Sequence, residues 1–464
     1  MKAIDSENNK NLQSDAWRLE QLQMSTASKN HPYHKFGTGN LETLNKSNVR
    51  DALMAYHSKY YSANLMTLAI LGKEDLTTLG KWVQEYFSAV PNKNAEAPKF
   101  NGVPFEPEHL QKQFKVVPVK DLRRVTLTWA LPPQKDNYTS KPSHYLAHLV
   151  GHEGPGSLLS LLKNKGWGLE LMAGEFRGCD DFTIWSIVID LTPEGLEHTD
   201  DVISTCFQYI KLVREQGIQK WISEELQKTS KMNFDYQDKQ GAMGFVSKKA
   251  GHLYEYPAKQ VLSGPSVVDA FDEELLKQTI SHLTPEKMRV VLISKDFDGV
   301  TDSVSPWYSA KYCVEDIPQS KIQAWTAVEL NSGLVLPEPN PFVPDDLTVK
   351  KAPEETTIPK MVRNSEISRL WHLQDSTFLL PKAVASFSIT TPLTYLTPAN
   401  VVMAKMFTKL LADSLNEFAY AADMGGLQYN VIPSIEGLQM IINGYNCKQS
   451  VLLKKVFEKM VSLD

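Results

Sequence analysis

The spacing of apolar positions along the chain predicts an alternation of helices and strands. Helical periodicity over residues 6–24, 50–60 and 76–87 predicts three helices, and Asp5 or Ser6 is placed to cap the first. The apolar run at residues 64–72 predicts a buried strand. Residues 31–40, rich in Pro, Gly and Asn, predict a loop.

The middle of the chain repeats this alternation. Thr126 and Thr128 alternate with Val125, Leu127 and Trp129, which is typical of a half-buried strand. A helical stretch over residues 144–165 is interrupted at "GHEGPG". Further strands are predicted at residues 169–176, 181–191 and 287–295, with a long amphipathic helix at residues 197–217.

Two pairs of segments resemble each other, which predicts an internal repeat. Residues 60–76 resemble 282–299, and residues 163–174 resemble 421–432, where a helix ends at Gly before an outgoing strand. We expect an α+β fold in which one domain type recurs, each copy a mainly antiparallel sheet packed with helices. The predicted division is 1–97, 98–333, a Pro-rich linker at 334–363, and 364–464.

Composition excludes several classes of protein. The net charge of −5 arises from 49 basic and 54 acidic residues without a dense basic block, so no nucleic acid partner is expected. The four cysteines form no CxxC pair, which favours a reducing compartment. Because no signal-peptide core or membrane-spanning apolar run occurs, we expect no membrane association and a cytoplasmic location.

The most conspicuous candidate for metal binding is the segment around His148 and His152. These residues are four apart, as two zinc ligands on one helical face must be, and Glu153 follows directly. Gly151 and Gly154 break the helix at that point, and neither HExxH nor HxxEH occurs in the chain. Locally hydrogen-bonded histidines beside an exposed backbone are therefore favoured over a zinc site that also requires a remote carboxylate.

Two other groups of polar residues have simpler interpretations. Asp5 and Glu7 lie at a predicted helix start, where acidic side chains complement the helix dipole. His31 and His34 occupy a loop without a nearby third ligand, which favours solvated histidines.

Several long segments carry a family resemblance. "DSENNKN", "HPYHKFGTGN", "HLVGHEGPGSLLSLLKNKGW" and "DSLNEFAYAADMGGLQYN" resemble the insulysin branch of the pitrilysin family of inverted-zincin zinc metallopeptidases. "VTLTWALPP" is similar to nardilysin within the same family. The resemblance runs in order over essentially the whole chain, which therefore resembles an internal fragment of such an enzyme.

The resemblance implies four homologous α+β domains, paired into two halves that enclose a chamber for peptide substrates. It assigns residues 1–97 to the zinc-binding domain, 98–333 to a second domain without zinc, and 364–464 to the start of a third. Zinc (Zn2+) is held in the family by two histidines of HxxEH and a later glutamate, which Glu7 matches. No catalytic residue is expected in this chain, and the implied partners are peptides, the missing C-terminal half and a second copy in a homodimer.

The resemblance also implies an exosite that anchors the substrate's N-terminus, with Glu153 facing its α-amino group. Ala173 stands where insulysin has glycine, and residues 238–245 lack the arginines of the insulysin pattern. We expect the chain alone not to hydrolyse peptides, the alternative function being a non-catalytic peptide- or partner-binding protein. The expected exosite comprises His144, His148, Leu149, Val150, Gly151, His152, Glu153, Gly154, Leu171, Met172, Ala173, Gly174 and Glu175.

Overall fold

The computed structural model describes residues 1–100, 102–350 and 357–463, and its fold is α+β as expected. The chain forms two compact units. The first comprises Met1–His152, Gly156–Gln227 and Asp238–Pro337, and the second comprises Glu153–Pro155, Lys228–Gln237 and Glu338–Asp464. In the described ranges, none of the helices combines the length and the apolar character that crossing a membrane requires.

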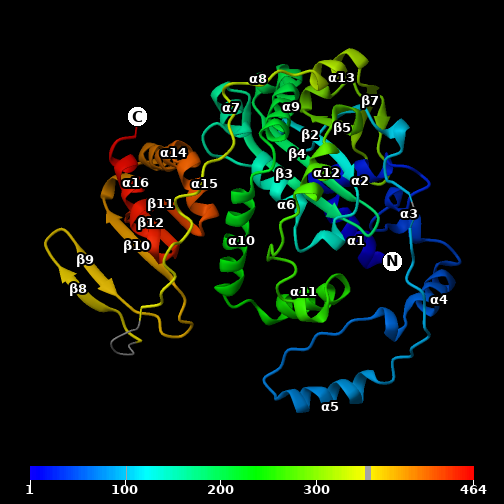
Figure 1. The fold of residues 1–464 in the computed structure, drawn as a ribbon, viewed down its shortest axis with the longest axis horizontal. Coiled ribbons are helices and arrows are strands. Elements are labelled where there is room, and N and C mark those ends of the chain that lie inside the picture. Colours follow the sequence, from blue (N-terminus) through cyan, green and yellow to red (C-terminus); the bar gives the residue numbers. More distant parts are fainter. Residues whose placement is uncertain (101, 351–356, 464) are drawn as a thin grey trace. The chain divides into compact units, whose positions relative to one another are not determined.

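The first unit is organised around a seven-stranded sheet of order β3-β4-β2-β5-β1-β7-β6 (Figure 1). β1 pairs with β5 in parallel, and the other pairings are antiparallel. The strands are β1 (Lys112–Val116), β2 (Arg124–Leu131), β3 (Gly168–Gly178), β4 (Thr183–Leu191), β5 (Met288–Ile293), β6 (Ser303–Val304) and β7 (Lys311–Asp316).

The helices of the first unit form two groups along the chain, one in the N-terminal segment and one after it. Those of the N-terminal segment are α1 (Lys2–Asn11), α2 (Asp15–Ser25), α3 (Leu41–Leu44), α4 (Val49–Tyr60) and α5 (Leu76–Phe87). Those that follow are α6 (Pro142–Val150), α7 (Leu158–Asn164), α8 (Pro193–Glu197), α9 (Thr199–Gln216), α11 (Ala242–Glu255), α12 (Glu273–Ser281) and α13 (Gln319–Thr326). The residues of α10 (Lys220–Asp235) are divided between the two units.

The alternation predicted for β2 is confirmed and separates the two faces of the sheet. Val125, Leu127 and Trp129 are each 1% exposed and belong to the main core, together with buried residues of α6, α7 and α9. Thr126 and Thr128 point to the opposite face, where the Thr128 hydroxyl lies 3.1 Å from the Ser186 hydroxyl. This second face carries a mixture of polar and apolar side chains beneath α2.

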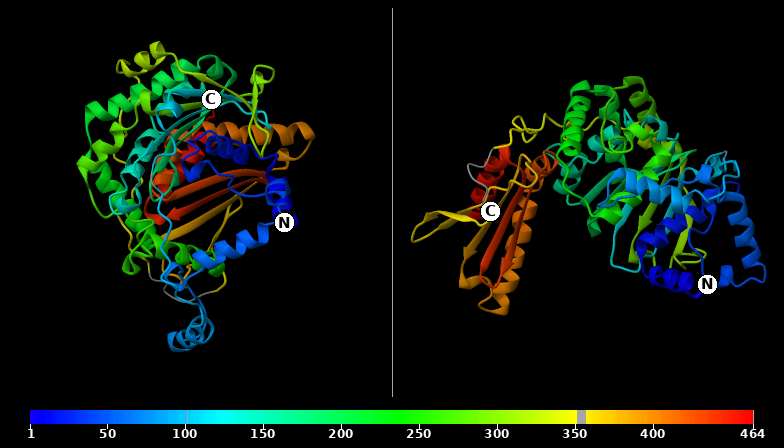
Figure 2. Two further views of the ribbon diagram at one scale, coloured as in Figure 1. Left: turned by 90° about the vertical axis from the view of Figure 1, so that its right-hand side faces the viewer. Right: turned by 90° about the horizontal axis from the view of Figure 1, so that it is seen from below.

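The second unit has its own three-stranded antiparallel sheet, of order β10-β12-β11 (Figure 2). Its strands are β10 (Lys382–Thr390), β11 (Leu427–Ser434) and β12 (Gly437–Tyr445), and its helices are α14 (Pro398–Ser414), α15 (Asn416–Met424) and α16 (Gln449–Val461). Leu411, Met440 and Leu452 are fully buried in its core.

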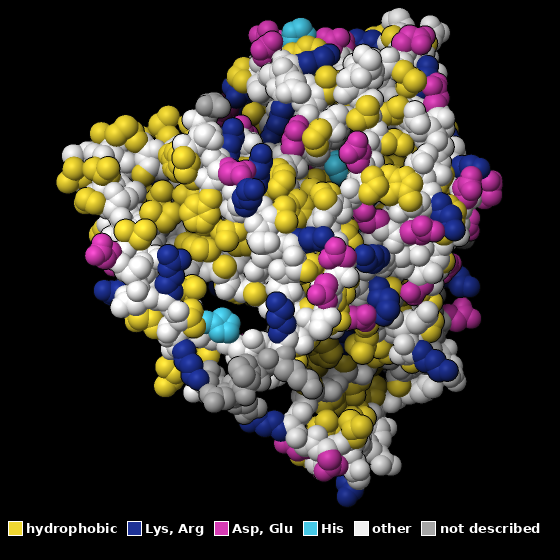
Figure 3. Space-filling model, turned by 60° about the vertical axis from the view of Figure 1, so that its left-hand side comes forward, with side chains coloured by type: hydrophobic (Ala, Val, Ile, Leu, Met, Phe, Trp, Pro, Cys, Tyr) yellow, Lys and Arg dark blue, Asp and Glu magenta, His cyan; other side chains and the backbone are white. Residues whose placement is uncertain are grey.

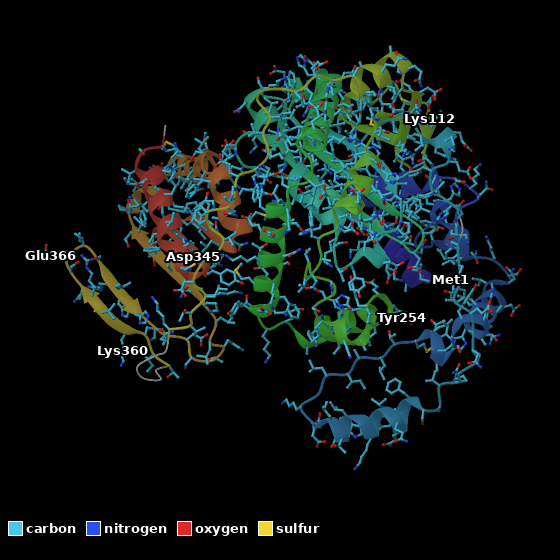
Figure 4. The ribbon with its side chains drawn as sticks, viewed as in Figure 1. Met1, Lys112, Tyr254, Asp345, Lys360 and Glu366 are labelled. Carbon is cyan, nitrogen blue, oxygen red and sulfur yellow. The ribbon has the colours of Figure 1, made fainter. Side chains whose placement is uncertain are left out.

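A separate hairpin, β8 (Lys360–Asn364) with β9 (Arg369–His372), belongs to the second unit. Figure 4 shows Lys360 at the base of the hairpin and Glu366 at its turn. Hydrophobic side chains gather over this unit in Figure 3, and those of the hairpin and α14 include the exposed Met361, Trp371 and Met403.

Of the two predicted repeat pairs, the one that joins residues 163–174 and 421–432 is visible in the structure, whereas residues 60–76 do not form the strand that residues 282–299 contain. α7 ends before Gly166 (φ 73°) and leads into β3, and α15 ends before Gly426 (φ 76°) and leads into β11. In both places the positive φ is a conformation that glycine adopts without strain. β3 and β11 are also both edge strands of their sheets.

Two expectations about secondary structure were wrong, and so was the expectation of a solvated His31, which is 5% exposed with its Nε2 2.7 Å from Asp181 Oδ2. Residues 6–24 are not one helix, because α1 already begins at Lys2 and α2 begins at Asp15; Asp5 therefore lies inside α1, where its Oδ1 accepts a hydrogen bond from the Leu41 N–H (2.8 Å). Residues 64–72 form a 3-10 turn at Ala63–Leu65 and then an extended segment without a strand partner among the described residues. Tyr254 of α11, labelled in Figure 4, donates a hydrogen bond to the Leu65 carbonyl.

The remaining predicted elements are confirmed. The strands expected at residues 169–176, 181–191 and 287–295 correspond to β3, β4 and β5, and the long helix corresponds to α9. The helix interruption at "GHEGPG" separates α6 from α7. The division into domains stays a prediction, and residues 351–356 of the predicted linker lie outside the described residues.

Candidate functional site

The candidate exosite is built from α6 and the edge strand β3, which pack against each other. Pro142 occupies the first turn of α6, where a missing N–H costs nothing, and the preceding Lys141 has a left-handed backbone (φ 43°). Tyr145 and Leu146 anchor the helix in the core of the first unit. The helix stops at Gly151, so the histidine pair spans the end of α6 rather than one continuous face.

Two glycines, Gly151 and Gly174, have close neighbours at the positions that a Cβ would occupy. A Cβ added at Gly151 would lie 2.8 Å from the Ala147 carbonyl oxygen and 3.6 Å from the backbone N of Ala173. Gly174 has φ of +151°, and its Cβ would lie 3.3 Å from the Cβ of Ala147. Residues of α6 and β3 therefore lie in contact with both glycines, and the peptide approach expected from the sequence stays a prediction.

The outer edge of β3 is the part of this arrangement that can bind a peptide backbone. β3 pairs with β4 along one edge, with register shifts near Glu170 and Glu175, and no strand among the described residues pairs with its other edge. Met172 and Phe176 are each about half exposed. Such an edge offers N–H and C=O groups to an added strand.

A groove of about 630 Å³ lies beside β3. It brings together four of the expected exosite residues, His144, Ala173, Gly174 and Glu175. It also contains residues that the sequence did not single out, namely Gln134, Lys135, Asn137, Tyr138, Lys141, Pro142, Ser143, Ala147, Gly178, Cys179, Asp180, Glu255 and Tyr256. The Lys-Pro step at the start of α6 was the available signal for Lys141, since a residue before Pro is kept out of the helix.

Two charged side chains of the groove, Lys141 and Glu175, have pKa values that burial shifts. Lys141 Nζ donates to the carbonyl oxygens of Tyr138 (2.5 Å) and Gly264 (2.6 Å), and burial lowers its pKa. Burial raises the pKa of the Glu175 carboxyl, and the positive charge of Lys141 opposes that shift. The groove therefore presents a carboxylate next to a lysine whose donors are already committed to backbone oxygens.

His148 and His152 lie close together and are neutral at pH 7. Their ring centroids are 5.7 Å apart in an edge-to-face arrangement. Burial, followed by the neighbouring His152 and His144, lowers the pKa of His148 to about 3, and burial lowers the pKa of His152 to about 4. Two neutral imidazoles in contact are a packing pair in the first instance.

The geometry does not bring a third metal ligand to this pair. Among residues 1–100, 102–350 and 357–463, one group of three His, Cys, Asp or Glu side chains has its possible ligand atoms within 4.8 Å of one another. This group consists of Glu106, Glu108 and His109. Neither the histidine pair nor Glu7 belongs to it. Glu7 lies exposed on α1 and supplies one carboxylate.

Four other expected exosite residues do not line this groove. Leu149, Val150 and Leu171 are buried in the core of the first unit, so their side chains support the site and do not line it. Glu153 belongs to the second compact unit, where its Oε2 accepts a hydrogen bond from Asn416 Nδ2 (3.1 Å).

Comparison with known proteins places these features in a family. Residues 48–230 match the family model described as "Peptidase M16 inactive domain", and residues 234–464 match "Middle or third domain of peptidase_M16". The chain is 42% identical over 469 residues to the insulin-degrading enzyme of Bos taurus, covering all of this chain and 46% of the relative. It is 36% identical to nardilysin of Pongo abelii, covering all of this chain and 42% of the relative.

Among solved structures, pitrilysin superposes with a TM-score of 0.80 at 26% identity, over all of this chain and half of that one. The chain thus spans about half the length of the curated relatives it matches. The two family models together account for nearly all residues from 48 onward, and the relatives and the pitrilysin structure agree with them. The chain therefore belongs to the M16 peptidase family.

Proposed function

We propose that this chain is the peptide-anchoring part of an insulysin-like zinc metalloendopeptidase that hydrolyses small polypeptides in an enclosed chamber. The observation that carries the proposal is the open edge of β3 beside a groove of about 630 Å³. A purely non-catalytic peptide-binding role is the second candidate, and the family description "inactive domain" for residues 48–230 favours it for this part of the protein.

In the proposed mode, an extended peptide adds to β3 as a further antiparallel or parallel strand. The backbone groups on the open edge supply sequence-independent hydrogen bonds, and alternate side chains of the peptide enter the groove. This mode suits an anchor for varied polypeptides, because affinity depends on main-chain groups that all peptides share.

The α-amino group of the peptide is proposed to meet Glu175. This carboxylate lines the groove, whereas Glu153 does not and is hydrogen-bonded to Asn416. The Lys141 ammonium donates to two carbonyl oxygens in the same groove. A peptide ammonium would pair with the Glu175 carboxylate in a charge-assisted hydrogen bond.

Zn2+ is proposed as the cofactor of the full-length enzyme, with Glu7 as one ligand. A catalytic zinc site takes about three protein ligands and an open position. Among the described residues, Glu7 belongs to no group of three possible metal ligands, so these residues do not by themselves form a site for the metal. We expect the purified 464-residue chain to show no zinc-dependent peptide cleavage.

Strand addition has a signature that tests the anchoring proposal without altering the protein. A fluorescently labelled extended peptide is N-methylated either at its odd or at its even positions, and its binding is followed by anisotropy. Because successive N–H groups of a strand point to opposite edges, one series should bind at least about fivefold more weakly while the other binds nearly normally. Equal losses in both series would refute strand addition.

A pair of variants on the same strand tests the role of Glu175. Glu175→Gln should abolish the preference for a free over an acetylated peptide N-terminus, since the acceptor loses its charge. Glu170→Gln is the matched control, because Glu170 is exposed on β3 and does not line the groove. An unchanged preference in Glu175→Gln would remove this residue from the proposal and leave strand addition standing.

The partners and location of the full-length enzyme remain proposals of the same kind. We infer peptide substrates, a C-terminal half that completes the chamber, a homodimer and a cytoplasmic location. Cross-linking of the full-length protein in cell extracts, followed by fractionation, tests the dimer and the location together. A monomer confined to an organelle would contradict both.

A further inference from the structure

A second cavity, of about 330 Å³, lies on the sheet face opposite the main core of the first unit. Its floor is formed by alternate residues of β2, β4 and β5, which include Thr126, Ser186 and Arg289, and α2 covers it. None of its lining residues lines the peptide groove. The cavity is therefore a separate feature of this unit.

Arg289 is the unusual residue of this cavity. Its side chain is 3% exposed, and Nη2 donates to the Thr26 hydroxyl at 2.6 Å. Its Nε and Nη1 atoms are buried without a hydrogen-bond partner. The guanidinium carbon lies 4.3 Å from the ring centroid of Phe105 and 4.6 Å from that of Phe114.

The two aromatic rings do not replace the missing hydrogen bonds. They stabilise the cation through their faces, while the in-plane N–H donors of a guanidinium require oxygen acceptors. Burial lowers the pKa of Arg289 to about 10, so the side chain stays protonated at neutral pH. A buried cation with unused planar donors is a site for an anion.

The other charges around the cavity are already paired. Arg124 is held by Asp190, with Nη2 3.0 Å from Oδ2, and Arg177 is held by Glu20. Of the arginines that line the cavity, Arg289 is thus the one without a carboxylate partner. A ligand that carries one negative charge could therefore pair with Arg289 in this cavity.

The remaining walls are largely apolar. They include Leu19, Leu22, Val188, Val291 and Ile293, from α2, β4 and β5. A volume of about 330 Å³ lies near the lower limit of roughly 300–1,000 Å³ for small-molecule sites. A phosphate or a nucleotide would leave these walls unmatched, whereas an apolar chain with one terminal carboxylate matches both the walls and the cation.

We propose that the cavity beneath α2 binds an apolar monocarboxylate, whose carboxylate pairs with Arg289 and whose chain packs against the walls that α2, β4 and β5 provide. The planar carboxylate accepts donors of the guanidinium fork that lack partners in the structure. The ligand would tie α2 to the sheet and so stabilise the first unit.

Decanoate, used below its micellar concentration, is the probe, and binding to the full chain is measured by calorimetry. Saturable binding of one decanoate is expected, with decanol bound at least about tenfold more weakly because it lacks the charge. Arg289→Met should weaken decanoate binding by a similar factor, and Arg289→Lys should retain part of it. No saturable binding, or equal binding of decanoate and decanol, would overturn the proposal.

A second pair of variants covers the case in which Arg289→Met does not fold. Ala16 is exposed on α2 and lines the cavity, so Ala16→Glu and Ala16→Gln both suit a helix surface. The added negative charge of Ala16→Glu should weaken decanoate binding relative to Ala16→Gln and leave decanol binding equal in both. Equal decanoate affinity of the two variants would exclude an anion site in this cavity.

Discussion

Acidification should destabilise the first unit through His148 and His152 well before the carboxylates titrate. The pKa values of about 3 and about 4 lie below the unperturbed value of 6.5 that applies to the unfolded chain. A histidine with a lowered folded-state pKa keeps its full contribution to stability above pH 6.5. The contribution is lost as pH falls from 6.5 towards the folded-state values, because the unfolded chain then binds protons that the folded chain does not.

The magnitude follows from the size of the shifts. At pH 5 each histidine is about 1.5 pH units below the unfolded value, which corresponds to about 2 kcal/mol, or about 4 kcal/mol for both. Both side chains are partly exposed, so solvent screening reduces this sum, and we expect a loss of about 2–3 kcal/mol between pH 7.5 and pH 5. His144 is exposed and is left out of the sum.

Urea unfolding at the two pH values, followed by tryptophan fluorescence, measures this loss. Trp129 and Trp185 are buried in the core of the first unit and report on it directly. The double variant His148→Gln/His152→Gln should lose about 2–3 kcal/mol less than the unaltered chain over this pH range. His57→Gln, at an exposed position of α4, should behave like the unaltered chain.

The comparison has a clear refuting result. If the unaltered chain and the double variant lose the same free energy of unfolding between pH 7.5 and pH 5, the two histidines are not held neutral by burial. A loss of stability in His57→Gln equal to that of the double variant would show that any histidine produces the effect.

Three single substitutions, one in the first unit and two in the second, test the packing within each unit by chemical unfolding. Gly195→Ala would place a Cβ 1.9 Å from the Trp167 carbonyl oxygen, so the free energy of unfolding of the first unit should fall by about 2–3 kcal/mol. A decrease of less than about 1 kcal/mol would contradict this prediction. Leu452→Ala removes a fully buried side chain and should cost the second unit about 3 kcal/mol while the tryptophan transition of the first is unchanged. Tyr445→Phe removes a buried hydroxyl that donates to the Met232 carbonyl (3.1 Å) and should cost about 1 kcal/mol, whereas equal or greater stability would refute that hydrogen bond.

The sequence predicted the elements whose pattern is decided locally. The alternation around Thr126 and Thr128 marked β2, because one face of the strand meets the main core and the other does not. The glycines at the ends of α7 and α15 marked the internal repeat, because a left-handed residue is required at both places. Such signals depend on a few neighbouring residues and survive without knowledge of the tertiary fold.

The candidate site was predictable only in part, since its residues are assembled from distant segments. His144, Gly174 and Glu175 meet in one groove, but Glu255 joins them only through the fold. The cavity around Arg289 gave no local signal. A single arginine in an apolar strand indicates neither the two aromatic rings nor the missing acceptors around it.

The segment at residues 64–72 shows why an apolar run is not sufficient for a strand. Residues 282–299, which resemble it, contain β5, and β5 is hydrogen-bonded to β1 on one side and β2 on the other. Residues 64–72 have no such neighbours in the described parts of the chain, and Leu68 and Ile70 remain more than 40% exposed. Both segments have the composition of a buried strand, but the backbone groups of a strand need partners on adjacent strands. The sequence pattern therefore describes what a segment can become, and the availability of neighbouring strands decides whether it does.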